Sequence, residues 1–130
     1  MKGLLHHIEI YVRDLKKTTE FWGWLLSELG YEEFQSWEKG ISYILSGSYI
    51  VFVQVEEKYL DIPYHRCRAG LNHLAFRGES RDFVDYITKE LKNRDIKILY
   101  EDKHPFAGGP DYYAVYFEDP DRMKVEIVAD

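Results

Sequence analysis

The spacing of apolar and polar residues divides the chain into two halves with the same order of elements. Strand-like alternation near the start, with Ile8, Ile10 and Val12 as the apolar set, returns in Leu74 and Phe76. Each of these segments is followed by a helical pattern. After Asp14, a plausible N-cap, apolar residues recur at helical spacing until Gly30, and Ser80 opens a second such stripe that runs to Leu91.

Three short segments rich in β-branched and aromatic residues follow each helix. They are Tyr31–Trp37, Ile41–Leu45 and Tyr49–Val55 in the first half and Ile96–Tyr100, Tyr112–Glu118 and Lys124–Val128 in the second. The sequence therefore predicts an α+β fold of two tandem βαβββ modules within one domain, residues 1–130. Module 1 is expected at about residues 1–57 and module 2 at about residues 70–130, joined by a linker at about residues 58–69.

The alternation also predicts which side chains share a face of each strand. In the first strand His7 and Glu9 lie opposite the apolar set, and in the second module His73 and Glu126 do the same. His6 is expected on the helix side. His7 and His73 occupy repeat-related positions 66 residues apart. Two imidazoles and a carboxylate suit Zn²⁺, Fe²⁺, Mn²⁺, Ni²⁺ or Co²⁺, so these three residues are candidate ligands of one divalent metal ion. Each one alone is more often a partly exposed strand residue.

Composition narrows the possible partners. Seventeen Lys and Arg residues against 23 Asp and Glu residues give a net charge of −6, which disfavours nucleic acid. No apolar run approaches the ~20 residues needed to cross a bilayer, so no membrane is expected. Cys67 is the single cysteine, which fits a cytoplasmic protein without disulfides. Trp24, at the edge of the first helical stripe, could serve a subunit contact in a homodimer.

The stretches Leu5–Leu15, Gly70–Phe76 and Tyr116–Glu126, the last with its Asp-Pro-Asp turn, resemble the vicinal oxygen chelate superfamily of glyoxalases, extradiol dioxygenases, fosfomycin-resistance thiol transferases and bleomycin-binding proteins. The resemblance implies a cup-shaped mixed sheet with helices on the convex side, usually in a homodimer. It assigns the metal ligands to His7, His73 and Glu126. It also suggests that Tyr116, ten residues before Glu126, contacts a small-molecule substrate.

Two departures from the family pattern concern carboxylates and the last turn. Glyoxalases usually take a second glutamate from the end of the first module, but Tyr49–Val55 contains no carboxylate. Glu9 could instead be a fourth ligand, a base that moves a proton, or only a solvated carboxylate. Arg122 occupies a turn position where the family often has Gly.

Two loops have open roles. His104–Asp111 is either a gate beside the site or simply a turn, with His104 a weak candidate for substrate contact. Tyr64–Arg68 carries two cations and an imidazole, which could bind an anionic group of the substrate or lie in a solvated loop.

The expected function is that of a metal-dependent enzyme that chelates a small oxygen-rich molecule, with lyase or isomerase, dioxygenase or thiol-transferase chemistry. The alternative is a non-enzymatic, ligand-sequestering protein of the bleomycin-resistance type. The sequence leaves open the identity of the metal, the substrate, and whether one chain or a dimer completes the cup.

Overall fold

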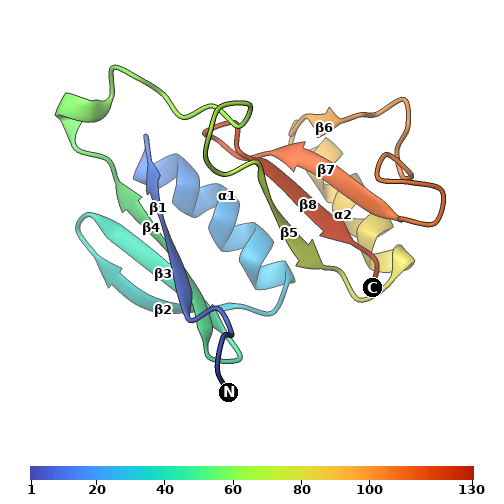
Figure 1. Cartoon of the computed structure of the whole chain (residues 1–130), viewed down its shortest axis with the longest axis horizontal. Helices are drawn as coiled ribbons and strands as arrows, with labels where there is room; N and C mark the ends of the chain where they lie inside the picture. The colour runs from blue at the N-terminus through green and yellow to red at the C-terminus, as the bar shows by residue number, and fades with distance from the viewer. The chain divides into compact units, whose positions relative to one another are not determined.

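Each half of the chain folds as a strand, a helix and three further strands (Figure 1). The computed structural model describes residues 1–130. The chain forms two compact units, Met1–Pro63 and Tyr64–Asp130. The predicted α+β fold of two tandem βαβββ modules is confirmed. Neither α-helix has the length and apolar composition needed to span a membrane.

In the first unit the sheet has the strand order β1-β4-β3-β2. Its parts are β1 (His7–Val12), α1 (Leu15–Glu28), β2 (Glu32–Trp37), β3 (Gly40–Leu45) and β4 (Ser48–Gln54), followed by a short 3₁₀ helix, Glu57–Tyr59. β1 and β4 are parallel and the other pairs are antiparallel. The side chain of Asp14 caps α1 by accepting a hydrogen bond from the Lys17 amide, as the sequence predicts.

The second unit repeats this topology with the strand order β5-β8-β7-β6. It consists of β5 (His73–Arg77), α2 (Arg81–Asn93), β6 (Ile98–Leu99), β7 (Ala114–Glu118) and β8 (Lys124–Val128). β5 and β8 are parallel, and β7 is antiparallel to both β6 and β8. Ser80 caps α2 by accepting from the Phe83 amide.

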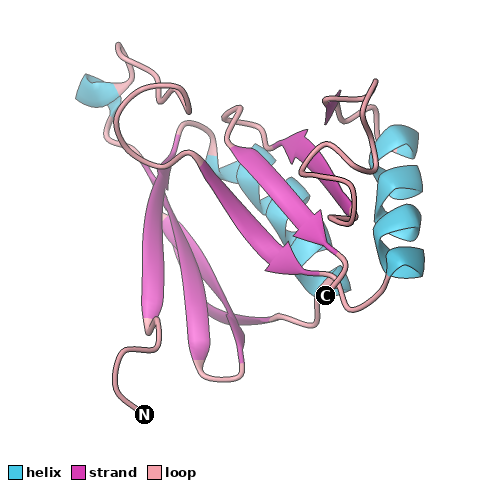
Figure 2. Ribbon diagram, turned by 45° about the vertical axis from the view of Figure 1, so that its right-hand side comes forward, coloured by secondary structure: helices cyan, strands magenta, loops and turns pink.

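In each unit the helix packs on one face of its own sheet (Figure 2). The indole of Trp22 on α1 stacks on the ring of Phe52 on β4, with ring centroids 5.2 Å apart. In the second unit Ile87 and Leu91 of α2 are fully buried, as are Val125 and Ile127 of β8. These apolar faces remove large side chains from water and leave the opposite face of each sheet for polar groups.

The predicted faces are confirmed in the strands that carry the candidate ligands. In β1, His7 and Glu9 are exposed while Val12 is buried, and in β5 Leu74 and Phe76 alternate with Ala75 and Arg77.

Two strands are shorter than predicted. β6 ends at Leu99 because Tyr100 takes a left-handed φ of 55°, which is incompatible with a continuing strand. β7 begins at Ala114 rather than Tyr112, because Tyr112 belongs to the preceding turn. Trp24, expected at the edge of the helical stripe, is half-buried on α1.

Candidate metal centre

His73 and Glu126 lie together on the face of the second sheet opposite α2. The Nε2 atom of His73 is 3.1 Å from Oε1 of Glu126. The Glu126 side chain is only 3% exposed, and that of His73 is 33% exposed. Ladder pairing explains the approach, because Glu126 lies directly opposite Ala75 on β5, two residues after His73.

When the imidazole of His73 is neutral, its contact with Asn72 leaves a lone pair on Nε2 that faces a lone pair of Glu126 Oε1. Nδ1 of His73 is 2.7 Å from Oδ1 of Asn72, so the ring hydrogen lies on Nδ1 in the neutral imidazole. Nε2 then has no hydrogen and faces a carboxylate oxygen, which is unfavourable unless a cation or a proton lies between the two atoms. Two adjacent ligands bound at ~2.1 Å to one first-row ion would lie roughly 3.0–3.4 Å apart, so the observed spacing fits a shared ion.

The second carboxylate oxygen of Glu126 has a partner of its own. The hydroxyl of Tyr112 donates a short hydrogen bond to Oε2. This bond leaves Oε1 directed at His73, an arrangement typical of metal ligands, whose unused atoms are held by outer hydrogen bonds. The bond also raises the pKa of Tyr112 to about 12.

Tyr116, which the resemblance assigned to substrate contact, lies opposite Glu126 in the β7–β8 ladder. Its ring centroid is 6.3 Å from that of His73. Burial, followed by the negative charge of Glu126, raises the pKa of Tyr116 to about 12. The structure therefore brings three of the predicted site residues, His73, Glu126 and Tyr116, into one cluster.

His7 belongs to the first unit and stands at the start of β1. Its ring stacks on Tyr49, the residue directly opposite on β4, with centroids 4.7 Å apart and planes 4° from parallel. Nδ1 of His7 is 2.8 Å from Nδ1 of His6, so one of these atoms carries a hydrogen that the other accepts. Nε2 of His7 is not used by this contact and can serve as a ligand.

The prediction that His6 lies on the helix side is wrong. His6 precedes β1, so the alternation of the strand does not extend to it. Its ring contacts both His7 and Tyr49, on the side of the sheet that His7 occupies. His6 is therefore positioned to orient the imidazole of His7.

Glu9 follows on the same face of β1, exposed and opposite Val51. The residues of β4 that pair with β1 include no carboxylate and no histidine. In neither unit do three or more His, Cys, Asp or Glu side chains gather closely enough to hold an ion by themselves. Within the second unit, His73 and Glu126 therefore form a pair with no third such side chain beside them.

The cluster contains residues that the sequence did not single out. Asn72 contacts His73, Tyr112 donates to Glu126, and Tyr49 stacks on His7. Asn72 precedes His73 directly and could have been suspected as a neighbour. Tyr112 was expected at the start of the strand Tyr112–Glu118, but it precedes β7, so strand alternation does not predict its contact with Glu126.

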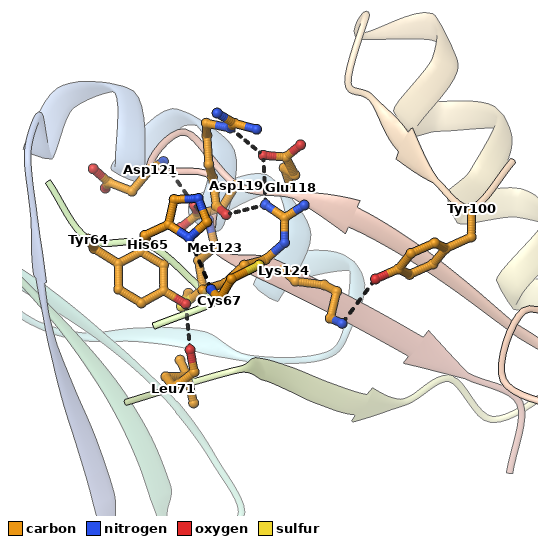
Figure 3. A network of polar contacts seen from close by, with 12 residues as sticks. Tyr64, His65, Cys67, Leu71, Tyr100, Glu118, Asp119, Asp121, Met123 and Lys124 are labelled. Carbon is orange, nitrogen blue, oxygen red and sulfur yellow. Dashed lines mark hydrogen bonds and ion pairs between the residues drawn. The ribbon is translucent and has the colours of Figure 1, made fainter. Parts of the chain in front are cut away.

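The largely exposed Tyr64–Arg68 segment is tied to the last turn through Arg66 (Figure 3). Nη1 of Arg66 is 3.3 Å from Oε2 of Glu118 and donates to the carbonyl of Arg122 at 3.1 Å. Arg122 takes a φ of 63°, the left-handed conformation that glycine adopts most easily, and its Nε donates to the same Glu118 oxygen at 2.9 Å. Arg66 is therefore engaged within the protein.

The His104–Asp111 loop packs against the tyrosines of the cluster. A Cβ atom on Gly108 would lie 2.4 Å from a ring carbon of Tyr112 and 2.7 Å from the hydroxyl of Tyr116. Burial lowers the pKa of the nearby His104, and Lys92 adds to the effect. The loop thus contacts the residues around Glu126 through its backbone at Gly108.

Comparison with known proteins confirms the resemblance. A model of the Glyoxalase/Bleomycin resistance protein/Dioxygenase superfamily matches residues 4–127. The crystal structure of a putative glyoxalase from Bacillus halodurans is 56% identical and superposes with a TM-score of 0.98, covering 99% of this chain and 97% of that one.

Two further relatives are a glutathione transferase and a fosfomycin resistance protein. The glutathione transferase FosA of Serratia marcescens is 28% identical over 123 residues, which are 95% of this chain and 78% of that protein. A mutant of the fosfomycin resistance protein FosX from Listeria monocytogenes, crystallised with Mn(II) and 1S,2S-dihydroxypropylphosphonic acid, is 28% identical. It superposes with a TM-score of 0.69 over 99% of this chain and 90% of that one.

Proposed function

The chain belongs to the Glyoxalase/Bleomycin resistance protein/Dioxygenase superfamily, and from this premise we propose that it is a metal-dependent enzyme acting on a small oxygen-rich molecule. His73 and Glu126 of the second unit and His7 of the first are the proposed ligands of one divalent ion. The observation that carries the proposal is the pairing of His73 and Glu126, in which Nε2 of His73 lies 3.1 Å from Oε1 of Glu126 while Nδ1 of His73 contacts Asn72.

The ion would supply Lewis-acid chemistry, polarising the oxygen atoms of a chelated substrate. The protein side chains supply the rest. Tyr112 holds the Glu126 carboxylate by donating to Oε2. Tyr116, with a pKa of about 12, keeps its proton at neutral pH and can donate a hydrogen bond to a substrate oxygen. Glu9 is the proposed residue that moves a proton.

Among the reaction classes open to this scaffold, we propose addition to an epoxide. FosA and FosX support this choice, because each is 28% identical across nearly all of this chain. FosA is a glutathione transferase, which uses a thiol, and FosX was crystallised with a diol, 1S,2S-dihydroxypropylphosphonic acid. In such a reaction the oxygen of water or the sulfur of a thiol bonds to one epoxide carbon. The C–O bond at that carbon breaks, and the proton lost by the nucleophile ends on the released oxygen, so the product is a diol or a hydroxy thioether.

Metal content tests the ligand set. Protein purified without added metal, stripped with a chelator and titrated with Mn(II) and with Zn(II), should bind about one ion per chain. His7→Ala, His73→Ala and Glu126→Gln should each lose most of this binding. His65→Ala is the matched control, because His65 is exposed and its ring accepts a hydrogen bond from the amide of Cys67.

Wild-type protein that binds no ion, or ligand variants that bind as well as His65→Ala, would contradict the metal centre. The reaction class is tested separately by incubating the loaded protein with fosfomycin and either water or glutathione, followed by ³¹P NMR. A new phosphonate signal formed by wild type and not by Glu126→Gln supports epoxide opening. A protein that binds the compound equally without metal and never converts it would instead be a ligand-sequestering protein.

We also propose that the chain forms a homodimer and acts in the cytosol. β2 is an edge strand whose residues are all exposed, and it presents Phe34 and Trp37 at 48% and 45% exposure. Apolar side chains on an open edge favour pairing with another chain. Sedimentation at micromolar concentration should show a dimer that Trp37→Lys weakens, whereas a wild-type monomer across that range would contradict this proposal.

A further inference from the structure

Lys124 lies on the same face of the second sheet as the proposed metal ligands. It is the ladder partner of His73 in the β5–β8 pair and precedes Glu126 by two residues. Alternation along the strand therefore places its side chain beside both ligands. Its Nζ is 3.2 Å from the hydroxyl oxygen of Tyr100 (Figure 3).

The positive charge of Lys124 has no carboxylate partner within ion-pair distance. Its cross-strand neighbour on β7 is Glu118, which could have neutralised it. The Glu118 carboxylate is instead bound by Arg66 and Arg122 through Oε2. Lys124 is thus a half-buried cation whose charge is not neutralised by a carboxylate of the protein.

Tyr100 completes a pair of hydrogen-bond donors. The ammonium group of Lys124 donates to the tyrosine oxygen, so the tyrosine hydroxyl keeps its own hydrogen for another acceptor. The ring of Tyr100 meets that of Tyr116 edge-on, with centroids 5.5 Å apart. The left-handed φ of 55° at Tyr100 is costly for an aromatic residue, and such strain is often associated with a functional position.

We propose that Lys124 and Tyr100 form a subsite for an oxyanion, such as the phosphonate, phosphate or carboxylate group of the substrate. The inference extends the proposed function, since it adds that the molecule bound at the metal carries an anionic group a few atoms from its chelated oxygens. A cation and a hydroxyl that both donate recognise an oxyanion, and a lysine acts on it as a point charge.

The subsite can be tested without metal, so its failure is distinct from failure of the metal centre. Methylphosphonate and acetate are titrated separately into the metal-free protein while the NMR signals of the Lys124 and Tyr100 side chains are recorded. We expect saturable shifts at both residues in wild type, in Tyr86→Phe and in Lys89→Met. In Lys124→Met the Tyr100 signal should no longer shift, and in Tyr100→Phe the Lys124 signal should shift with at least several-fold weaker affinity.

Lys89 is the matched control because it is an exposed lysine of the same unit, on α2. Saturable binding of either anion that depends on Lys124 supports the subsite, and tighter binding of methylphosphonate than of acetate assigns it to phosphonate or phosphate groups. Absence of saturable shifts in wild type, or equal shifts of the Tyr100 signal in Lys124→Met and wild type, would overturn the inference. The folded state of Lys124→Met is checked by its amide spectrum.

Discussion

Val51 occupies in the first sheet the register position that Glu126 occupies in the second. Val51 pairs with Glu9, two residues after His7, just as Glu126 pairs with Ala75, two residues after His73. On the other side, Ser42 repeats Tyr116. The first unit therefore repeats the histidine but has an apolar residue where the second has its carboxylate.

His6 is expected to influence metal binding although it is not a proposed ligand. Its Nδ1 is 2.8 Å from Nδ1 of His7, so His6→Ala removes a contact that orients the ligand ring. Losing an outer partner of a metal-bound histidine typically weakens binding about 10-fold. Competition titration with a chromophoric chelator measures this, with the stronger loss in His7→Ala for comparison. Unchanged affinity in His6→Ala would show that the contact between the two rings has no role in binding.

Tyr112→Phe should also weaken metal binding, by roughly 10-fold, because Oε2 of Glu126 loses its donor and the carboxylate becomes free to rotate. The ring is retained, so the packing of Gly108 against it is preserved. Tyr86→Phe on α2 is the control, since it removes an exposed tyrosine hydroxyl of the same unit. The same chelator competition gives the affinities, and equal values for the two variants would argue against a role for Tyr112.

Gly108→Ala should destabilise the protein by about 1–3 kcal/mol, because the added methyl group overpacks the space beside Tyr112. The nearest contact would be 2.4 Å from Cδ1 of Tyr112. Urea denaturation measures the loss. If the clash is the cause, Tyr112→Ala should be less harmful in the Gly108→Ala background than in wild type, and strict additivity of the two changes would exclude this explanation.

His104 should make folding stability depend on pH near neutrality. Its pKa is lowered in the folded protein, first by burial and then by Lys92, so the neutral imidazole is favoured there. As pH falls below about 6.5, the unfolded chain takes up this proton before the folded protein does, and stability decreases. Thermal unfolding at about pH 7.5 and 5.5 should show a smaller difference in Tm for His104→Gln than for wild type. His65→Gln serves as the exposed control, and an identical pH dependence in both variants would contradict the prediction.

The sequence by itself determined the order of the elements, both helix caps and the faces of the ligand strands. These features depend on local rules: helical spacing, strand alternation and the hydrogen bond of a capping side chain, as at Asp14 and Ser80. The positions of His73 and Glu126 on a shared face followed from the same rules. The alternation failed at His6 because that residue lies before the strand that the rule describes.

Only the tertiary structure decided which side chains surround the ligands. Strand pairing across 10 residues sets Tyr116 opposite Glu126, and a turn brings the Tyr112 hydroxyl to Oε2 of Glu126. Lys124 is left with Tyr100 as its partner because Glu118 bonds to Arg66, 52 residues away in the chain. Such contacts depend on ladder register and on turns with no periodic pattern, so a sequence read through local periodicity does not contain them.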